Sequence, residues 1–216
     1  MKKIFIIFIV LLLKGDMNMK FYVNIKTVIK PSDYLVLVNK NNKLNNNYIP
    51  DDLVKINNNY TEGDKYLRRE VYKNITHLID DANNLGLTLS ISSAFRSYLY
   101  QNNLYNYYVK SKGIDYADLC SARLGHSEHQ TGLAVDLEGS NKDYDNFVNS
   151  KEFNWVSKNA HKYGFILRYN NNKVNITGFK YEPWHYRYVG KDAATYIYNN
   201  NICLEEYIKK MNNHLS

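Results

Sequence analysis

Apolar residues recur at helical spacing between Glu62 and Leu85, which predicts a long amphipathic helix over this stretch. Gly86 directly after the run would end the helix. The residues that would share its apolar face are Leu67, Val71, Ile75, Leu78, Ile79 and Ala82. Further helices are predicted at Tyr98 to Lys112, at Phe153 to Tyr163 and in the sequence CLEEYIKKM at 203–211.

Shorter stretches show the alternation of apolar and polar residues that is typical of strands. LTLSIS at 87–92 has this period of two, and strands are also predicted at Phe165 to Tyr169 and at Gly178 to Val189. The stretch 33–56 is interpreted as extended with an asparagine-rich turn, and NNNKVNITG after Tyr169 as a plain hairpin. Helices followed by clustered strands predict an α+β fold, in which helices flank a small, mainly antiparallel sheet.

The first residues differ in character from the rest of the chain. Lys2 and Lys3 precede ten unbroken apolar residues from Ile4 to Leu13, and Lys14 follows. This is the pattern of a secretory signal, and the apolar run is too short to span a bilayer comfortably. We therefore expect residues 1–20 to be a signal peptide or a short membrane anchor, 21–33 a connector, and 34–212 one exported domain.

Charge and cysteine content narrow the set of partners. The formal net charge is +7, which suits an anionic partner, but no basic cluster is dense enough to indicate nucleic acid. Cys120 and Cys203 lie far apart and lack the spacing of metal ligands. An exported protein could pair them, yet they are interpreted as two ordinary small residues. The chain is expected to be a monomer.

The stretch GHSEHQTGLAVD at 125–136 concentrates side chains that can bind metals. In the strand-like run after Gly132, Ala134 and Asp136 would share one face, opposite the apolar residues. A carboxylate is costly to bury alone, and His129 can return toward Asp136 across the glycine turn. A divalent cation between the two would offset that cost.

A third ligand is predicted in YEPWHYRYV at 181–189. A strand that begins near Trp184 would place Trp184, Tyr186 and Tyr188 on one side. His185 and Arg187 would then point to the other side. Two imidazoles and one carboxylate with an open position for water are typical of a catalytic zinc site, so one Zn²⁺ per chain is expected. His126, three residues before His129, is the rival ligand. His161 and His214 are interpreted as structural, and His77 as a packed or surface residue of the first helix.

Hydrolysis of an amide also needs a base and a group that stabilises the developing negative charge. Glu182 lies three residues before His185, and Pro183 should bend the chain so that both reach one site. Arg96 in SSAFRSYLYQ can bind a carboxylate or the oxyanion, and Gln101 can reach the same cleft. The alternative for Arg96 is a surface ion pair.

SSAFRSYLYQ, GHSEHQTGLAVDL and EPWHYRYVG resemble the signature segments of VanY-type D-alanyl-D-alanine carboxypeptidases, in the zinc peptidase group that includes lysostaphin-like enzymes and hedgehog domains. The resemblance implies the fold of that group and a role for each site residue. His129, Asp136 and His185 would bind zinc, Glu182 would be the catalytic base, and Arg96, Ser127 and Gln101 would contact substrate or intermediate. One difference is Leu124, which stands directly before Gly125 and His126 at a position where many members of the family have proline.

The function expected from this resemblance is a zinc D,D-carboxypeptidase that removes the terminal D-alanine of peptidoglycan stem peptides. An L,D-carboxypeptidase and a peptidoglycan endopeptidase remain as alternatives, because the bond-breaking step is the same for all three. A non-catalytic, zinc-stabilised wall-binding module is the alternative from another class. Glu182 argues against the module, since binding alone needs no base.

Overall fold

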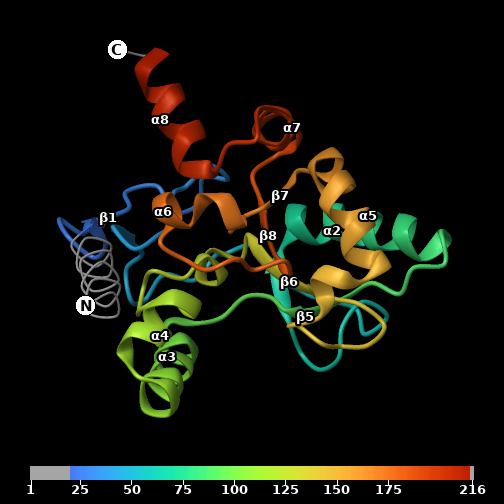
Figure 1. Ribbon diagram of the computed structural model, residues 1–216, viewed down its shortest axis with the longest axis horizontal. Coiled ribbons are helices and arrows are strands. Elements are labelled where there is room, and N and C mark those ends of the chain that lie inside the picture. Colours follow the sequence, from blue (N-terminus) through green and yellow to red (C-terminus); the bar gives the residue numbers. More distant parts are fainter. Residues whose placement is uncertain (1–19, 215–216) are drawn as a thin grey trace, which may run out of the picture.

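The computed structural model describes residues 20–214, and all but the last residue of the predicted signal segment at 1–20 lies outside this range. At the centre is a four-stranded sheet in the order β5-β6-β8-β7 (Figure 1). Its strands are β5 (Ser90–Ser93), β6 (Ala134–Glu138), β8 (His185–Tyr188) and β7 (Phe165–Leu167). Every neighbouring pair is antiparallel, which confirms the predicted α+β class with a small antiparallel sheet.

Two smaller sheets involve the N-terminal part of the described chain. β1 (Lys26–Thr27) pairs in parallel with β2 (Asn42–Lys43), and β3 (Leu53–Lys55) pairs antiparallel with β4 (Tyr66–Arg68). The stretch from Tyr34 to Val38 is not a strand in the structure. Its burial nevertheless alternates as its apolar pattern predicts, because Val36 and Val38 are buried and the residues between and beside them are less so.

One face of the sheet is covered by α2 (Arg69–Asn84) and α5 (Lys151–Asn159), which contact each other. The apolar stripe of α2 packs in one core cluster with the apolar residues of β6 and with Tyr186 of β8. In Figure 1, α3 (Tyr98–Lys112) and α4 (Ile114–Cys120) form a separate pair away from α2 and α5. The sheet therefore buries its apolar side against α2 and leaves its polar side chains near the α3–α4 pair.

Helix caps explain two accurately predicted boundaries. Ser97 accepts a hydrogen bond from the backbone N–H of Tyr100 at 3.2 Å and starts α3. Gly113, with φ of +83°, ends that helix, so its bounds are those predicted. Ser150 caps α5 in the same way, through the N–H of Phe153 at 3.0 Å, so the helix predicted from Phe153 begins two residues earlier, at Lys151.

The predicted helix over 62–85 is wrong at its start. Residues 66–68 form β4 instead, because they pair with β3 and Arg68 forms an ion pair of 2.8 Å with Asp52. The predicted strand over 178–189 is shorter in the structure, where only β8 is a strand, and the strand predicted over 165–169 is limited to β7.

The predicted hairpin after Tyr169 is also wrong. This stretch forms the short helices η4 (Asn171–Lys173) and α6 (Val174–Thr177), which Gly178 ends in a left-handed conformation. The remaining helices are η1 (Glu128–Thr131), η2 (Phe147–Asn149), η3 (Ala160–Tyr163), α7 (Lys191–Asn200) and α8 (Leu204–His214). Of these, α8 and η3 match predicted helical stretches.

Two further observations concern the predictions about cysteines and the membrane. Cys120 and Cys203 are free, in agreement with their interpretation as unpaired residues. Within residues 20–214, none of the helices combines the length and the apolar composition needed to cross a bilayer.

Candidate metal centre and active site

The register of two neighbouring strands brings Asp136 and His185 together. They are direct cross-strand partners in the β6–β8 pair, so their side chains leave the sheet on the same face. Asp136 Oδ1 lies 3.1 Å from His185 Nδ1. The apolar neighbours Val135 and Tyr186 point to the other face and join the core. The alternation predicted for both strands is confirmed.

His129 reaches the same point from η1. The chain turns at Gly132, whose φ of +66° is left-handed, and β6 then runs back past the histidine. His129 Nδ1 lies 2.6 Å from the carbonyl oxygen of Ala94, and since a carbonyl only accepts, Nδ1 carries the proton. Nε2 therefore has a free lone pair. It is buried, has no hydrogen-bond partner and lies 3.4 Å from Asp136 Oδ1.

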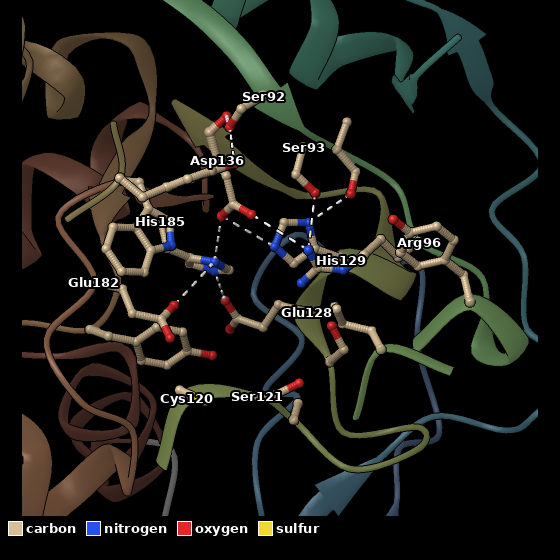
Figure 2. A pocket seen from close by; sticks show the side chains of 18 of the residues that line it. Ser92, Ser93, Arg96, Cys120, Ser121, Glu128, His129, Asp136, Glu182 and His185 are labelled. Carbon is tan, nitrogen blue, oxygen red and sulfur yellow. Dashed lines mark hydrogen bonds and ion pairs between the residues drawn. The ribbon is translucent and has the colours of Figure 1, made fainter. Parts of the chain in front are cut away.

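These three side chains fit a metal ion. One ligand atom from each of His129, Asp136 and His185 lies within 4.8 Å of the others, and all three residues are buried. A buried imidazole nitrogen without a partner costs free energy in the absence of a cation, and a cation would satisfy it. Figure 2 shows the three side chains converging from η1, β6 and β8.

The other histidines do not join this group. The rival ligand His126 has its Nδ1 2.7 Å from the carbonyl oxygen of Asn39 and packs edge-on against Tyr22. His161 stacks on Tyr198, with ring centroids 3.9 Å apart, in agreement with a structural role. His77 is exposed on α2, and the side chain of His214 lies outside the described part of the chain.

Burial and the neighbouring charges set the protonation of the three side chains. Burial, together with the Arg96 guanidinium, lowers the pKa of His129 to about 4. Burial alone would raise the pKa of Asp136, but the two histidines hold it well below its usual value. Burial alone would lower the pKa of His185, yet hydrogen bonds to Asp136 and Glu128 raise it to about 9. A cation bound to these atoms would therefore displace a proton from His185.

Glu182 lies beside this group, as predicted. Pro183 and Trp184 form a turn in which the N–H of His185 donates to the carbonyl oxygen of Glu182 at 3.2 Å. The turn places Glu182 Oε2 3.8 Å from His185 Nδ1. Burial raises the pKa of this carboxyl to about 7. Glu182 is thus a buried carboxyl that can take up and give back a proton near neutral pH.

Arg96 is part of the site and does not form the surface ion pair of the alternative interpretation. Its Nη1 lies 3.5 Å from Asp136 Oδ2 and donates to Ser93 Oγ at 3.0 Å. Its Nε donates to Gln101 Oε1 at 3.2 Å, and Gln101 Nε2 donates to Ser121 Oγ and to the carbonyl oxygen of Ala122. Gln101 is buried and does not line the cavity, so in this structure it holds Arg96.

A cavity of about 700 Å³ opens onto these groups. Its walls come from the polar face of the sheet and from the α3–α4 pair, so it lies between the two. In Figure 2, Cys120 and Ser121 lie across the cavity from Asp136. The cavity is large enough for several residues of a peptide. The residues predicted for the site that line it are Arg96, Ser127, His129, Asp136, Glu182 and His185.

Sequence reasoning missed Glu128, the residue next to His129. Its side chain is fully buried, and Oε1 accepts from Arg168 Nε and from Arg187 Nη1, each at 2.7 Å. Its Oε2 lies 3.3 Å from His185 Nε2. A signal for it was present, because Arg187 was predicted on the inward face of its strand and a buried guanidinium requires an anion.

Comparison with known proteins gives consistent results. The VanY family model, described as D-alanyl-D-alanine carboxypeptidase, matches residues 64–191. YodJ of Bacillus subtilis (strain 168), which is named a carboxypeptidase, is 40% identical over 194 residues, covering 87% of this chain and 71% of YodJ.

Two solved structures are also similar. The LdcB LD-carboxypeptidase is 39% identical with a TM-score of 0.80, over 87% of this chain and 91% of LdcB. A mutant of the vancomycin resistance D,D-pentapeptidase VanY in complex with Zn(II) is 32% identical with a TM-score of 0.70, over 81% of this chain and 98% of VanY.

Proposed function

The chain belongs to the VanY family of D-alanyl-D-alanine carboxypeptidases, and we propose that it is a zinc-dependent D,D-carboxypeptidase of peptidoglycan stem peptides. Membership of the family makes the chain a peptidase, and more generally a carboxypeptidase that acts on peptidoglycan; the D,D-specificity is the proposal. The observation that carries the proposal is the His129–Asp136–His185 group beside the buried carboxyl of Glu182 in one cavity.

One zinc ion per chain fits the three donor side chains. His129 Nε2, an Asp136 oxygen and His185 Nδ1 would hold it, since these are the atoms that face one another. The zinc complex of the related VanY structure supports this choice of metal. When bound, Zn²⁺ would act as a Lewis acid that makes water more acidic and polarises the scissile carbonyl.

Glu182 is proposed as the general base and acid. Its carboxylate takes the proton of the attacking water and then gives it to the nitrogen of the departing D-alanine, so that one residue serves both half-steps. Its place in the cavity wall, with Oε2 3.8 Å from His185 Nδ1, supports this role. Its burial excludes competing water and favours the return of the proton to the leaving group.

Arg96 is proposed to stabilise the negative charge that develops on the carbonyl oxygen. Its guanidinium is fixed by Ser93 and Gln101, so little reorganisation is needed as the charge forms. Ser127 lines the same cavity and is proposed to bind the substrate. Gln101 is proposed to act mainly by holding Arg96 in place.

An L,D-carboxypeptidase is the second candidate, because the LdcB LD-carboxypeptidase resembles this chain over nearly its whole length. Incubation of the purified protein with synthetic tri-, tetra- and pentapeptide stems separates the two candidates. Release of D-alanine from the pentapeptide alone supports the D,D-activity, and release from the tetrapeptide alone supports the L,D-activity. Internal cleavage of cross-linked stems would indicate the endopeptidase alternative.

The substitution Glu182→Gln tests the catalytic role. The amide has nearly the same shape but cannot take up a proton, so hydrolysis should fall about 100-fold or more while zinc content and melting temperature stay close to those of the parent protein. An active E182Q protein would exclude Glu182 as the base. Wall binding without hydrolysis in either form would favour the non-catalytic module.

We further propose that the protein is an exported monomer that works on the cell-wall side of the membrane, with its N-terminal segment as a signal peptide or tether. The signal-like pattern of residues 4–13 and a wall polymer as substrate support this location. Fractionation of cells expressing the full chain tests it, because the protein should be found outside the cytoplasm.

A further inference from the structure

We propose that Glu128 is a positioning residue that fixes the tautomer of His185, and that a buried chain of ion pairs extends this control to helix α8. The inference rests on the proposed zinc site. The chain of contacts runs from Glu205 of α8 to Arg168, to Glu128 and to His185.

The two nitrogens of His185 face different partners. Nδ1 faces the metal-ligand group, 3.1 Å from Asp136 Oδ1, whereas Nε2 lies 3.3 Å from Glu128 Oε2. An ionised carboxylate only accepts hydrogen bonds, so it keeps a proton on Nε2 and leaves the Nδ1 lone pair for the metal. The hydrogen bond from the outer nitrogen also fixes the plane of the ring.

Glu128 remains ionised although its side chain is fully buried. Two guanidiniums, those of Arg168 and Arg187, each lie 2.7 Å from its Oε1, and both are themselves fully buried. These two short ion pairs compensate the burial of the carboxylate, and a buried guanidinium in turn requires an anion beside it. The second oxygen, Oε2, is left to accept from His185.

The same network reaches the C-terminal part of the described chain. Glu205 in the first turn of α8 accepts from Arg168 through both oxygens, at 2.9 and 2.7 Å. Helix α8 is also held by an apolar cluster that contains Leu204, Ile166 and Ile197, by a hydrogen bond from Asn39 to Glu205, and by an ion pair between Lys173 and Glu206. Among these contacts, the one with Arg168 leads on through Glu128 to His185.

The substitution Glu128→Gln is the sharpest test. If the amide oxygen accepts from the arginines, the amide NH₂ faces His185 Nε2, which must then present a lone pair. The proton moves to Nδ1 and blocks the metal. If the amide is turned the other way, its NH₂ faces two guanidiniums, so neither orientation satisfies all partners. We expect zinc affinity, measured by competition with a chelator, to fall about 10- to 100-fold.

Glu152→Gln is the matched control. Glu152 is also a buried glutamate, but it accepts from the backbone of Thr88 and does not line the cavity. Loading with Co²⁺ adds a spectroscopic measurement. The visible absorption bands should shift in E128Q and coincide with those of the parent protein in E152Q.

Glu128→Asp keeps the charge for the arginines but is too short to reach His185 as well, so it replaces E128Q if that variant does not fold. E128D should also lose zinc affinity about 10-fold or more. Glu205→Gln should lower the zinc affinity by less than E128Q does, whereas E152Q should leave it unchanged. An unchanged zinc affinity in E205Q would overturn the link to α8.

Zinc affinity in E128Q or E128D within about twofold of the parent value would overturn the role of Glu128. Failure of the parent protein to bind zinc would instead refute the proposed zinc function itself. The two failures are therefore distinguishable.

Discussion

Replacement of Arg187 by methionine tests whether the buried charge network also stabilises the fold. The Arg187 side chain is fully buried and donates to Glu128 Oε1 at 2.7 Å. It also donates to the carbonyl oxygens of Tyr34, Val36 and Tyr188, at 3.0, 2.8 and 3.1 Å. Methionine fills much of the same volume but donates nothing. Glu128 would lose one of its two guanidinium partners, and three carbonyl oxygens would lose the Arg187 donor.

The expected cost follows from these contacts. Removal of one partner from a buried ion pair costs about 3–5 kcal/mol when it leaves a buried charge uncompensated. Without Arg187, Glu128 and Glu205 share the single positive charge of Arg168, so one negative charge of the network is uncompensated. For a chain of this length each kcal/mol lowers the melting temperature by about 2–4 °C, so Arg187→Met should melt about 6–20 °C below the parent protein. Arg187→Lys should recover only part of the loss, since a single ammonium cannot reach all four acceptors.

The assay is thermal and urea unfolding of chelator-treated protein, so that metal affinity does not contribute to the result. Lys55→Met is the control, because Lys55 forms an exposed ion pair with Asp64 at 2.6 Å, and its loss should leave the midpoint unchanged. If R187M unfolds at the same temperature as K55M, the buried network does not stabilise the fold as argued.

Three further predictions concern the active site and the charges of the protein. Arg96→Lys should lower kcat/KM for release of D-alanine by about 100-fold or more, and an unchanged value would exclude Arg96 as the oxyanion partner. Zinc at 1,000 times its Kd should stabilise the chelator-treated protein by about 4 kcal/mol in unfolding experiments, and Asp136→Asn should abolish most of this gain. Burial lowers the pKa of Lys40 from 10.5 to about 8, so the unfolded chain binds more protons between these pH values. The parent protein should therefore gain about 3 kcal/mol relative to Lys40→Met as the pH rises through this window, whereas a constant difference would contradict the assignment.

The metal-ligand group could be predicted from the sequence because each ligand stands in a local pattern that fixes its direction. The strand alternation around Asp136 and His185 placed both on an inward polar face, and the Gly132 turn returned His129 to them. Their pairing needs only the β6–β8 register, which the apolar residues on the opposite face determine.

Other features depend on partners that are distant in sequence. The predicted helix over 62–85 began too early because residues 66–68 gain a strand partner in β3 that helical periodicity does not reveal. Glu128 lies in no periodic element. Its role becomes visible only when Arg168 and Arg187, about 40 and 60 residues away, are placed beside it.

The zinc site can be tested most directly by an anomalous difference map, recorded at the zinc absorption edge, from crystals grown with equimolar zinc. We expect one strong peak within reach of His129 Nε2, Asp136 and His185 Nδ1, at about 2.0–2.2 Å from each ligand atom. A peak at His126, or no peak within reach of these three side chains, would contradict it.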